Sequence, residues 1–484
     1  MIIIKKSTNL IQVNTYRFYD LYEEFPDLVV PDYQRAYTWD VAKVEELIQD
    51  WEEYVATAPI QTYYMGSVLL YANTKDDNFQ IIDGQQRLTT LALIYYQLYG
   101  KLLKGQNVEY NQTISGFNIA NNLNFAKQAT AKLEKLKEAD IFGKLEFTVI
   151  VSDNQDHAFA FFDSQNNRGV SLGVDDYLKA YHLRALPENL QEQKAKAWEH
   201  ITFKARKEEN HLLDLKHLFN EVLFKVRQWK GQSHFPYPNK TEVLTEFQKN
   251  TYTTETKTSF RLFPNNNNMR YHQLEYTDGG VQLISTEKPL AKKDYPFAIR
   301  QPVYKGQNFF DFTDKYHAIF SFLFNAKEER SYEVEKALQF YNALYTRDMS
   351  EYLRYYMQMC LVAYYDNFKE EQLFKAIQYF DYYLGAIRLE KYYVRQEAIK
   401  NSLKNASNSL LDVICNAYLP DEVFSFINQA KSTESIYVNN GFLNGKKEVK
   451  NNIIDRYIQR ICKFYNKDID NRLVEVKSRK QWIV

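Results

Sequence analysis

The chain has 484 residues, and 45% of them are hydrophobic, which is enough to build the cores of more than one domain. Its 61 basic and 61 acidic residues balance, so overall charge does not indicate a nucleic-acid or membrane partner, and such a partner would need a local patch. The three cysteines have no paired metal-ligand spacing, which indicates reduced thiols. The sequence shows neither a signal-peptide pattern nor a membrane-spanning apolar stretch, and we expect a cytoplasmic protein.

The first informative stretch runs from Leu28 to Trp39. Residues 28–30 predict a short strand that stops at Pro31, and Asp40 is a suitable N-cap for an amphipathic helix over residues 41–55. Gln34 and Arg35 therefore lie in a connection, where binding residues are often found. A surface arginine paired with a carboxylate is an equally good interpretation of Arg35.

The second stretch, Asp83-Gly84-Gln85-Gln86-Arg87, lies where a predicted strand ends and an apolar helix begins. The first N–H groups of a helix have no intrahelical acceptor, and such an end attracts phosphate. Gly84 removes the Cβ that would keep a ligand away, and Arg87 can supply a bidentate cationic group. An ordinary turn with an N-cap fits the same residues.

Residues 105–122 are rich in Asn and Gly and predict a loop, followed by a helix over 123–139 and a strand over 145–151. A third stretch, residues 157–172, predicts a helix that ends near Asn166, with Gly169 as its left-handed cap. Asn167 and Arg168 then project from a turn, and another helix starts at Asp175 and Asp176. Capping of helix ends is the alternative role for the residues of this turn.

The rest of the chain is predicted to be mostly helical. Residues 190–229 have helical spacing, residues 231–307 form an irregular insertion that allows short helices, and residues 309–465 predict six to eight packed helices. The pairs Tyr382-Tyr383 and Tyr392-Tyr393 predict one buried and one exposed ring each. Residues 446–480 carry eleven Lys or Arg against five acids, so they are either a DNA-docking patch or a solvated helix face.

Three stretches in this order, with Met65-Gly66-Ser67 between the first two, carry a family resemblance. They are residues 30–39, 82–90 and 162–172. With them the chain resembles the amino-terminal domain family of GmrSD-type restriction systems, whose core is similar to the ParB and sulfiredoxin fold. The resemblance covers residues up to about 190. It implies nucleotide binding and hydrolysis in support of defence against modified or foreign DNA.

Carried onto this sequence, the resemblance implies a phosphate site with a nucleoside triphosphate and Mg²⁺ as cofactors. Its catalytic residues would be Asp83, Arg87 and Arg35, and Asp83 would also hold the metal. The other residues expected to bind the nucleotide are Gln34, Gly84, Gln85, Gln86, Thr89, Asn167 and Arg168.

Many relatives carry a carboxyl-terminal His-Asn-His nuclease domain, but the last histidine here is His317, so the helical half cannot supply such a site. Cleavage is therefore expected from a separate nuclease or effector subunit, with DNA, modified or from phage, as a further partner. The oligomeric state is left open. A nucleotide-dependent sensor or regulatory subunit is the favoured hypothesis. The alternatives are a DNA- or nucleotide-binding module without turnover and a metal-dependent DNA nuclease acting alone.

The expected fold class is α+β, with a small ParB/sulfiredoxin-like mixed domain followed by a large helical region. We expect a nucleotide-binding domain over residues 1–190, a helical segment with the irregular insertion over 191–308, and a helical carboxyl-terminal domain over 309–484.

Overall fold

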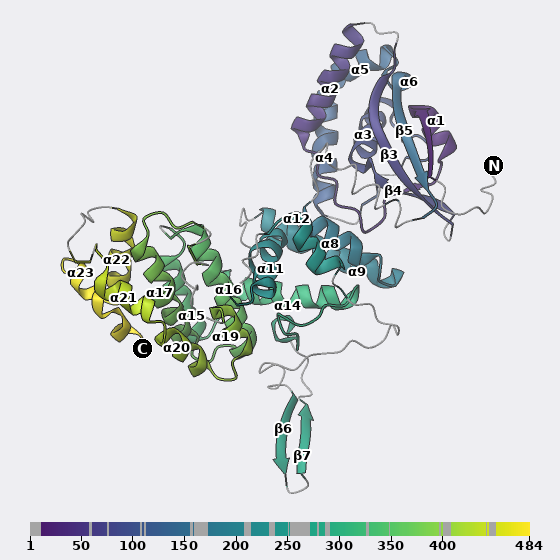
Figure 1. Ribbon diagram of the computed structural model, residues 1–484. Coiled ribbons are helices and arrows are strands. Elements are labelled where there is room, and N and C mark those ends of the chain that lie inside the picture. The colour runs from purple at the N-terminus through teal and green to yellow at the C-terminus, as the bar shows by residue number, and fades with distance from the viewer. Residues whose placement is uncertain are drawn as a thin grey trace. The chain divides into compact units, whose positions relative to one another are not determined.

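The structure of the protein is a computed structural model. It describes residues 11–57, 61–74, 77–106, 109–110, 113–154, 158, 173–207, 214–231, 238–249, 251, 272–277, 280–285, 291–325, 329–347, 349–395, 398–399, 408–441, 443–444 and 452–484. The chain divides into two compact units, Met1–Lys207 and Glu208–Val484 (Figure 1). The fold class is α+β as expected. The three domain ranges expected from the sequence stay a prediction.

Unit 1 contains one mixed sheet and the helices that cover it. Its described elements are β1 (Ile11–Arg17), α1 (Phe18–Glu24), β2 (Leu28–Val29), α2 (Val41–Ala56), β3 (Tyr63–Asn73), β4 (Asn78–Asp83), α3 (Gln85–Tyr99), α4 (Thr113–Gln128), α5 (Thr130–Glu138), α6 (Ile141–Lys144), β5 (Leu145–Ser152), α8 (Val174–Leu183) and α9 (Glu188–Lys207).

The five strands follow the order β1-β5-β3-β4-β2. The long central strand β3 pairs parallel with β5 and antiparallel with β4, and short β2 pairs parallel with β4 at the edge. Figure 1 shows α2, α3 and α4 beside this sheet. One buried apolar cluster joins the sheet to the helices, with Trp51 of α2, Val68 of β3 and Leu91 of α3 among its members. This burial supplies the main favourable free energy of the unit.

Helix α2 shows how closely local sequence rules hold in this unit. Asp40 is its N-cap, and the Asp40 carboxylate accepts the Lys43 N–H at 3.0 Å. Its buried residues are Val44, Leu47, Ile48 and Trp51, which share one face at helical spacing. The predicted helix, its cap and this face are confirmed.

Residues 113–122, predicted as part of a loop, instead form the first turns of α4. The reason is tertiary. The side chains of Ser115, Asn118 and Asn122 lie three to four residues apart on one helical face and bond to the Tyr37–Trp39 segment. These polar contacts outweigh the low helix propensity of Asn and Gly, which is the signal that the sequence interpretation followed.

Unit 2 is mostly helical. Its described elements are α10 (Leu215–His217), a π-helical turn (Leu218–Leu223), α11 (Phe224–Gln228), α12 (Lys240–Leu244), a second π-helical turn (Thr245–Lys249), β6 (His272–Thr277), β7 (Gly280–Ser285), a short 3₁₀ turn (Lys292–Asp294), α14 (Gln307–Phe324), α15 (Tyr332–Leu344), α16 (Glu351–Phe368), α17 (Leu373–Glu390), α19 (Leu410–Asn416), α20 (Pro420–Asn428), α21 (Lys431–Asn439), α22 (Ile453–Phe464), α23 (Arg472–Glu475) and a terminal 3₁₀ segment (Val476–Trp482). Between residues 307 and 464, eight α-helices have described bounds, and residues 398–399 are also helical.

The insertion between residues 231 and 307 contains more order than the sequence predicted. Strands β6 and β7 form an antiparallel hairpin, with Thr277 opposite Gly280. The residues at its turn, Asp278-Gly279, lie outside the described residues. Asp-Gly between two alternating stretches is a sequence signal for a hairpin.

Helices α16 and α17 form the centre of unit 2, because nearly all of their residues are buried. The prediction for the paired tyrosines is wrong for this reason. Tyr382 and Tyr383 lie within α17, and both are buried, while Tyr392 and Tyr393 follow the end of α17, and both are exposed. A helix that is packed against neighbours on all sides has no solvent-exposed face.

The carboxyl-terminal basic stretch does not form one solvated patch. The side chains of Arg479 and Asp381 are both fully buried, and they form an ion pair at 2.6 Å. Tyr345 and Tyr457 donate hydrogen bonds to the same carboxylate at 2.9 and 3.1 Å. Arg472 pairs with Asp455 at 2.6 Å. Lys446, Lys447 and Lys450 lie outside the described residues.

Replacing Asp381 by Ala leaves the buried Arg479 without its counter-charge. We expect Asp381→Ala to lower the free energy of unfolding of unit 2 by about 3 kcal/mol or more, since an uncompensated buried charge is costly. Lys477→Ala is the control, because Lys477 is exposed and bonds to exposed Asn444. Thermal and denaturant unfolding measure both. Equal stability of the two variants would contradict this assignment.

Candidate functional site

The centre of the candidate site is the junction between β4 and α3. Asp83 is the last residue of β4, and Gly84 precedes α3 with a φ of 95°. That left-handed conformation favours glycine, because a Cβ would be strained there. Gly84 has no side chain that could accept a hydrogen bond, so it does not cap the N–H groups in the first turn of α3.

Arg87 holds the neighbouring strand rather than projecting freely. Its two terminal nitrogens each donate to a backbone carbonyl of β3 at 2.6 Å, one to Met65 and the other to Ser67. Between these carbonyls lies Gly66, with a φ of 93°, where an added Cβ would collide with the Arg87 guanidinium. Asp83 lies 3.9 Å from the same guanidinium. Arg87 therefore holds the irregular part of β3 around Gly66 in place. Its guanidinium also lies near the Asp83 carboxylate.

Gln86 joins the start of α3 to the loop that follows β2. Its side-chain N–H donates to the Ala36 carbonyl at 2.9 Å, and its oxygen accepts the backbone N–H groups of Thr38 and Trp39 at 2.8 and 3.3 Å. Gln86 is buried, so these bonds form away from water. One side chain thus fixes both ends of the Ala36–Trp39 turn.

Three consecutive carbonyls of this loop accept hydrogen bonds from three side chains, two at the start of α3 and one in α8. Gln34 O accepts from Lys179 Nζ at 2.9 Å, Arg35 O from Gln85 Nε2 at 2.7 Å, and Ala36 O from Gln86 Nε2. The Gln34 side chain in turn donates to the carbonyls of Ile81 and Ile82 at 3.0 Å each. The backbone around Arg35 is therefore held from α3, α8 and β4.

The Arg35 side chain is half-buried. Its guanidinium forms no hydrogen bond or ion pair with any residue that the structure describes. A fixed backbone that carries a cation without a described hydrogen bond or ion pair is the arrangement expected of a ligand-binding arginine, since little conformational entropy remains to be lost on binding.

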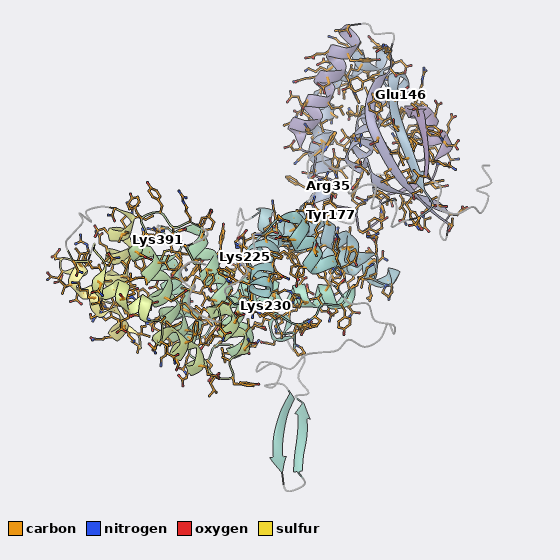
Figure 2. The ribbon with its side chains drawn as sticks, in the orientation of Figure 1. Arg35, Glu146, Tyr177, Lys225, Lys230 and Lys391 are labelled. Atoms are coloured by element: carbon orange, nitrogen blue, oxygen red, sulfur yellow. The ribbon has the colours of Figure 1, made fainter. Side chains whose placement is uncertain are left out.

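Helix α8 adds a carboxylate to this neighbourhood. The Gly173 N–H donates to Asp176 Oδ2 at 3.1 Å, which caps the start of the helix. Burial raises the pKa of the Asp176 carboxyl, and the nearby positive charge of Arg35 opposes that rise. Lys179, one turn further on, forms a buried ion pair with Glu199 of α9 at 2.7 Å. Figure 2 labels Arg35 and Tyr177, the residue after Asp176.

The structure thus brings the first two predicted stretches together. Asp83, Arg87 and Arg35 flank the start of α3, and Gln34, Gln85 and Gln86 are buried with their amides bonded within the chain. Thr89 is also buried, and its hydroxyl bonds to that of Tyr110. Asn167 and Arg168 lie outside the described residues.

Sequence reasoning missed Ser115, Asn118 and Asn122 of α4, which bond to the Tyr37–Trp39 segment, and Asp176 and Lys179 of α8. The residues of α4 were missed because the sequence predicted a loop there. Those of α8 were visible as an acidic first turn, and the lysine three residues after Asp176 lies on the same helical face.

Within the described parts of the chain, no group of three or more His, Cys, Asp and Glu side chains could hold a metal ion. No described helix is long and apolar enough to cross a membrane.

Residues 16–183 match the model of the GmrSD restriction endonuclease N-terminal domain, so unit 1 is a domain of this restriction-system class. The chain as a whole belongs to a family of unknown function (DUF7834), whose model matches residues 190–442, more than half of its length. Neither match is to a carboxyl-terminal nuclease domain. No curated protein matches the chain.

Gly66→Ala tests the clamp made by Arg87. A positive φ and the collision with the guanidinium predict a loss of about 2 kcal/mol in the stability of unit 1. The control is Gly116→Ala in α4, where an added Cβ meets nothing within 4 Å and should be neutral or slightly stabilising. Thermal unfolding of both variants is the measurement. If Gly66→Ala is as stable as Gly116→Ala, the assignment of Arg87 as a clamp on β3 is wrong.

Gln86→Ala tests the bridge between α3 and the Arg35 loop. It leaves one carbonyl and two N–H groups without their partner, and we expect a loss of about 2 to 3 kcal/mol. Gln97→Ala on the same helix is the control, because Gln97 makes only a long contact of 3.5 Å to Thr130. Hydrogen exchange should also show faster exchange at Thr38 and Trp39 in Gln86→Ala alone. Unchanged exchange there would show that the bridge is dispensable.

Proposed function

We propose that this protein is the nucleotide-dependent sensor or regulatory subunit of a restriction-type DNA defence system, directed against phage or modified DNA. The match of unit 1 to the GmrSD restriction endonuclease N-terminal domain supports the system class and an interaction with DNA. The nucleotide site is proposed at the β4–α3 junction. The observation that carries this proposal is the Arg35 loop, whose backbone is fixed while its guanidinium has no partner among the described residues.

The residues at this site have two roles: some bind the ligand, and others hold the binding groups in place. Arg35 and the first-turn N–H groups of α3 bind phosphate oxygens, because both supply hydrogen-bond donors and positive potential. Gln34, Gln85 and Gln86 hold the loop, and Arg87 holds β3 and faces Asp83. Support of this kind keeps donors fixed where negative charge develops during phosphoryl transfer.

Asp83 fits the role of carboxylate for a magnesium ion that is bound together with phosphates. Mg²⁺ in such sites uses one or two protein carboxylates, with phosphate oxygens and water as its other ligands. The Asp83 side chain is 36% exposed, so a metal–nucleotide complex can reach it. The ion supplies charge neutralisation of the phosphates when it is bound.

The helical unit is proposed to engage DNA or a partner chain, with cleavage supplied by a separate nuclease or effector subunit. Lys463 of the carboxyl-terminal basic stretch is exposed and can meet a phosphate backbone. Arg479 is not, because it lies in the core.

Arg35→Gln tests the nucleotide site directly. Loss of the charged donor should weaken binding of a nucleoside triphosphate with Mg²⁺ at least tenfold, and Asp83→Ala should abolish phosphate release. Arg17→Gln, an exposed arginine on β1 of the same unit, should change neither quantity. Calorimetric titration with ATP and GTP and a phosphate-release assay are the measurements.

Unchanged nucleotide binding in Arg35→Gln would reject the site. Binding by the unmodified protein without phosphate release, with or without DNA, would instead favour a binding module without turnover. Metal-dependent nicking of plasmid by the protein alone, lost in Asp83→Ala, would favour a nuclease.

A further inference from the structure

Among the described residues, each cation around the candidate phosphate site lies near an acid. Arg87 faces Asp83 at 3.9 Å, Lys179 is paired with Glu199 at 2.7 Å, and the remaining cation, Arg35, has the Asp176 carboxylate in its neighbourhood. Arg87 and Lys179 are thus paired with acids, whereas Arg35 has an acid nearby without a described ion pair. A free polyphosphate carries several negative charges, and these acids reduce its attraction to the described cations.

The position of Asp176 follows from helix geometry as well as from its charge. Asp176 and Lys179 are three residues apart in α8, so their side chains lie on one face of the helix. Lys179 donates to the carbonyl of Gln34, the residue before Arg35. The face of α8 that carries Asp176 is therefore the face that packs against the Arg35 loop.

Asp176 acts on Arg35 through charge and not through a hydrogen bond. One of its oxygens accepts the Gly173 N–H, and no described contact joins its carboxylate to the Arg35 guanidinium. A carboxylate without a hydrogen bond to the arginine does not fix the guanidinium plane. It does repel any phosphate that approaches the same arginine, and low local polarity strengthens this effect.

We propose that Asp176 makes this site selective for metal-complexed nucleotide over free nucleotide, by opposing the binding of an uncompensated polyphosphate to Arg35. This inference rests on the proposed nucleotide site. Magnesium removes two negative charges from the polyphosphate, so the repulsion by Asp176 is smaller for the complex than for the free anion. Asp83 favours the complex further, because it offers the ion a carboxylate ligand.

Asp176→Asn isolates the charge, because the amide oxygen can still accept the Gly173 N–H and cap α8. A matched control is Glu422→Gln in α20. Glu422 accepts the Leu419 N–H at 2.8 Å, a helix-start contact of the same kind, but it lies in unit 2. Thermal unfolding of each variant verifies that the cap survives.

The experiment is calorimetric titration of the full chain with ATP and with inorganic triphosphate, each with Mg²⁺ and with a chelator present. We expect Asp176→Asn to bind both free anions about fivefold more tightly while affinity for the magnesium complexes changes less than twofold. Glu422→Gln should match the unmodified protein in all four titrations.

Weaker binding by Asp176→Asn in every titration, or no change in any, would overturn the role of Asp176. Arg35→Gln separates this failure from failure of the site itself. If Arg35→Gln retains the affinity of the unmodified protein, the nucleotide site is misplaced. If Arg35→Gln loses affinity while Asp176→Asn behaves as the unmodified protein does, the site stands and only the proposed selectivity falls.

Discussion

The bridge made by the Gln86 side chain is the interaction on which the candidate site depends. A loop that follows a two-residue edge strand has little regular structure of its own, and its polar backbone groups need partners. Gln86 bonds to groups on both sides of the turn from the first turn of a buried helix. Because Gln86 is fixed to α3, the Arg35 loop and the start of α3 form one rigid piece.

This arrangement explains why the conspicuous polar residues of the second stretch are mostly buried. Gln85 and Gln86 hold the loop, and Arg87 holds the two carbonyls around Gly66. Glycine at residue 66 is favoured both by its positive φ and by the Arg87 guanidinium, which an added Cβ would meet. The residues left to meet a ligand are fewer than the motif suggests, namely Asp83, Arg35 and the first backbone N–H groups of α3.

The sequence predicted the elements that depend on local rules and missed those set by distant contacts. The strand at Leu28, the Asp40 cap and the helix after Gly84 follow from periodicity and capping, and the structure has them. The start of α4 could not be predicted this way, because Ser115 and Asn122 are stabilised by Tyr37 and Trp39, some 80 residues away in sequence. The burial of Arg479 likewise depends on Asp381, which lies on another helix.

The candidate site was only partly predictable for a related reason. A motif identifies which residues lie close together, but it does not show which of them bond to each other and which can bind a ligand. Arg35 and Arg87 looked alike in sequence, as cations next to a turn. The contacts separate them, since the guanidinium of Arg87 is occupied by two carbonyls and that of Arg35 has no partner among the described residues.

The contacts of the Arg35 loop also connect the candidate site to α8 and α9. Gln34 O bonds to Lys179 of α8, and Lys179 pairs with Glu199 of α9, with both partners of that pair shielded from water. A buried ion pair tolerates little displacement, because separation of its charges at low polarity is costly. The backbone of the Arg35 loop is therefore held in place relative to α8 and α9. Helix α9 ends at Lys207, the last residue of unit 1, so these bonds connect the Arg35 loop to the helix at the end of this unit.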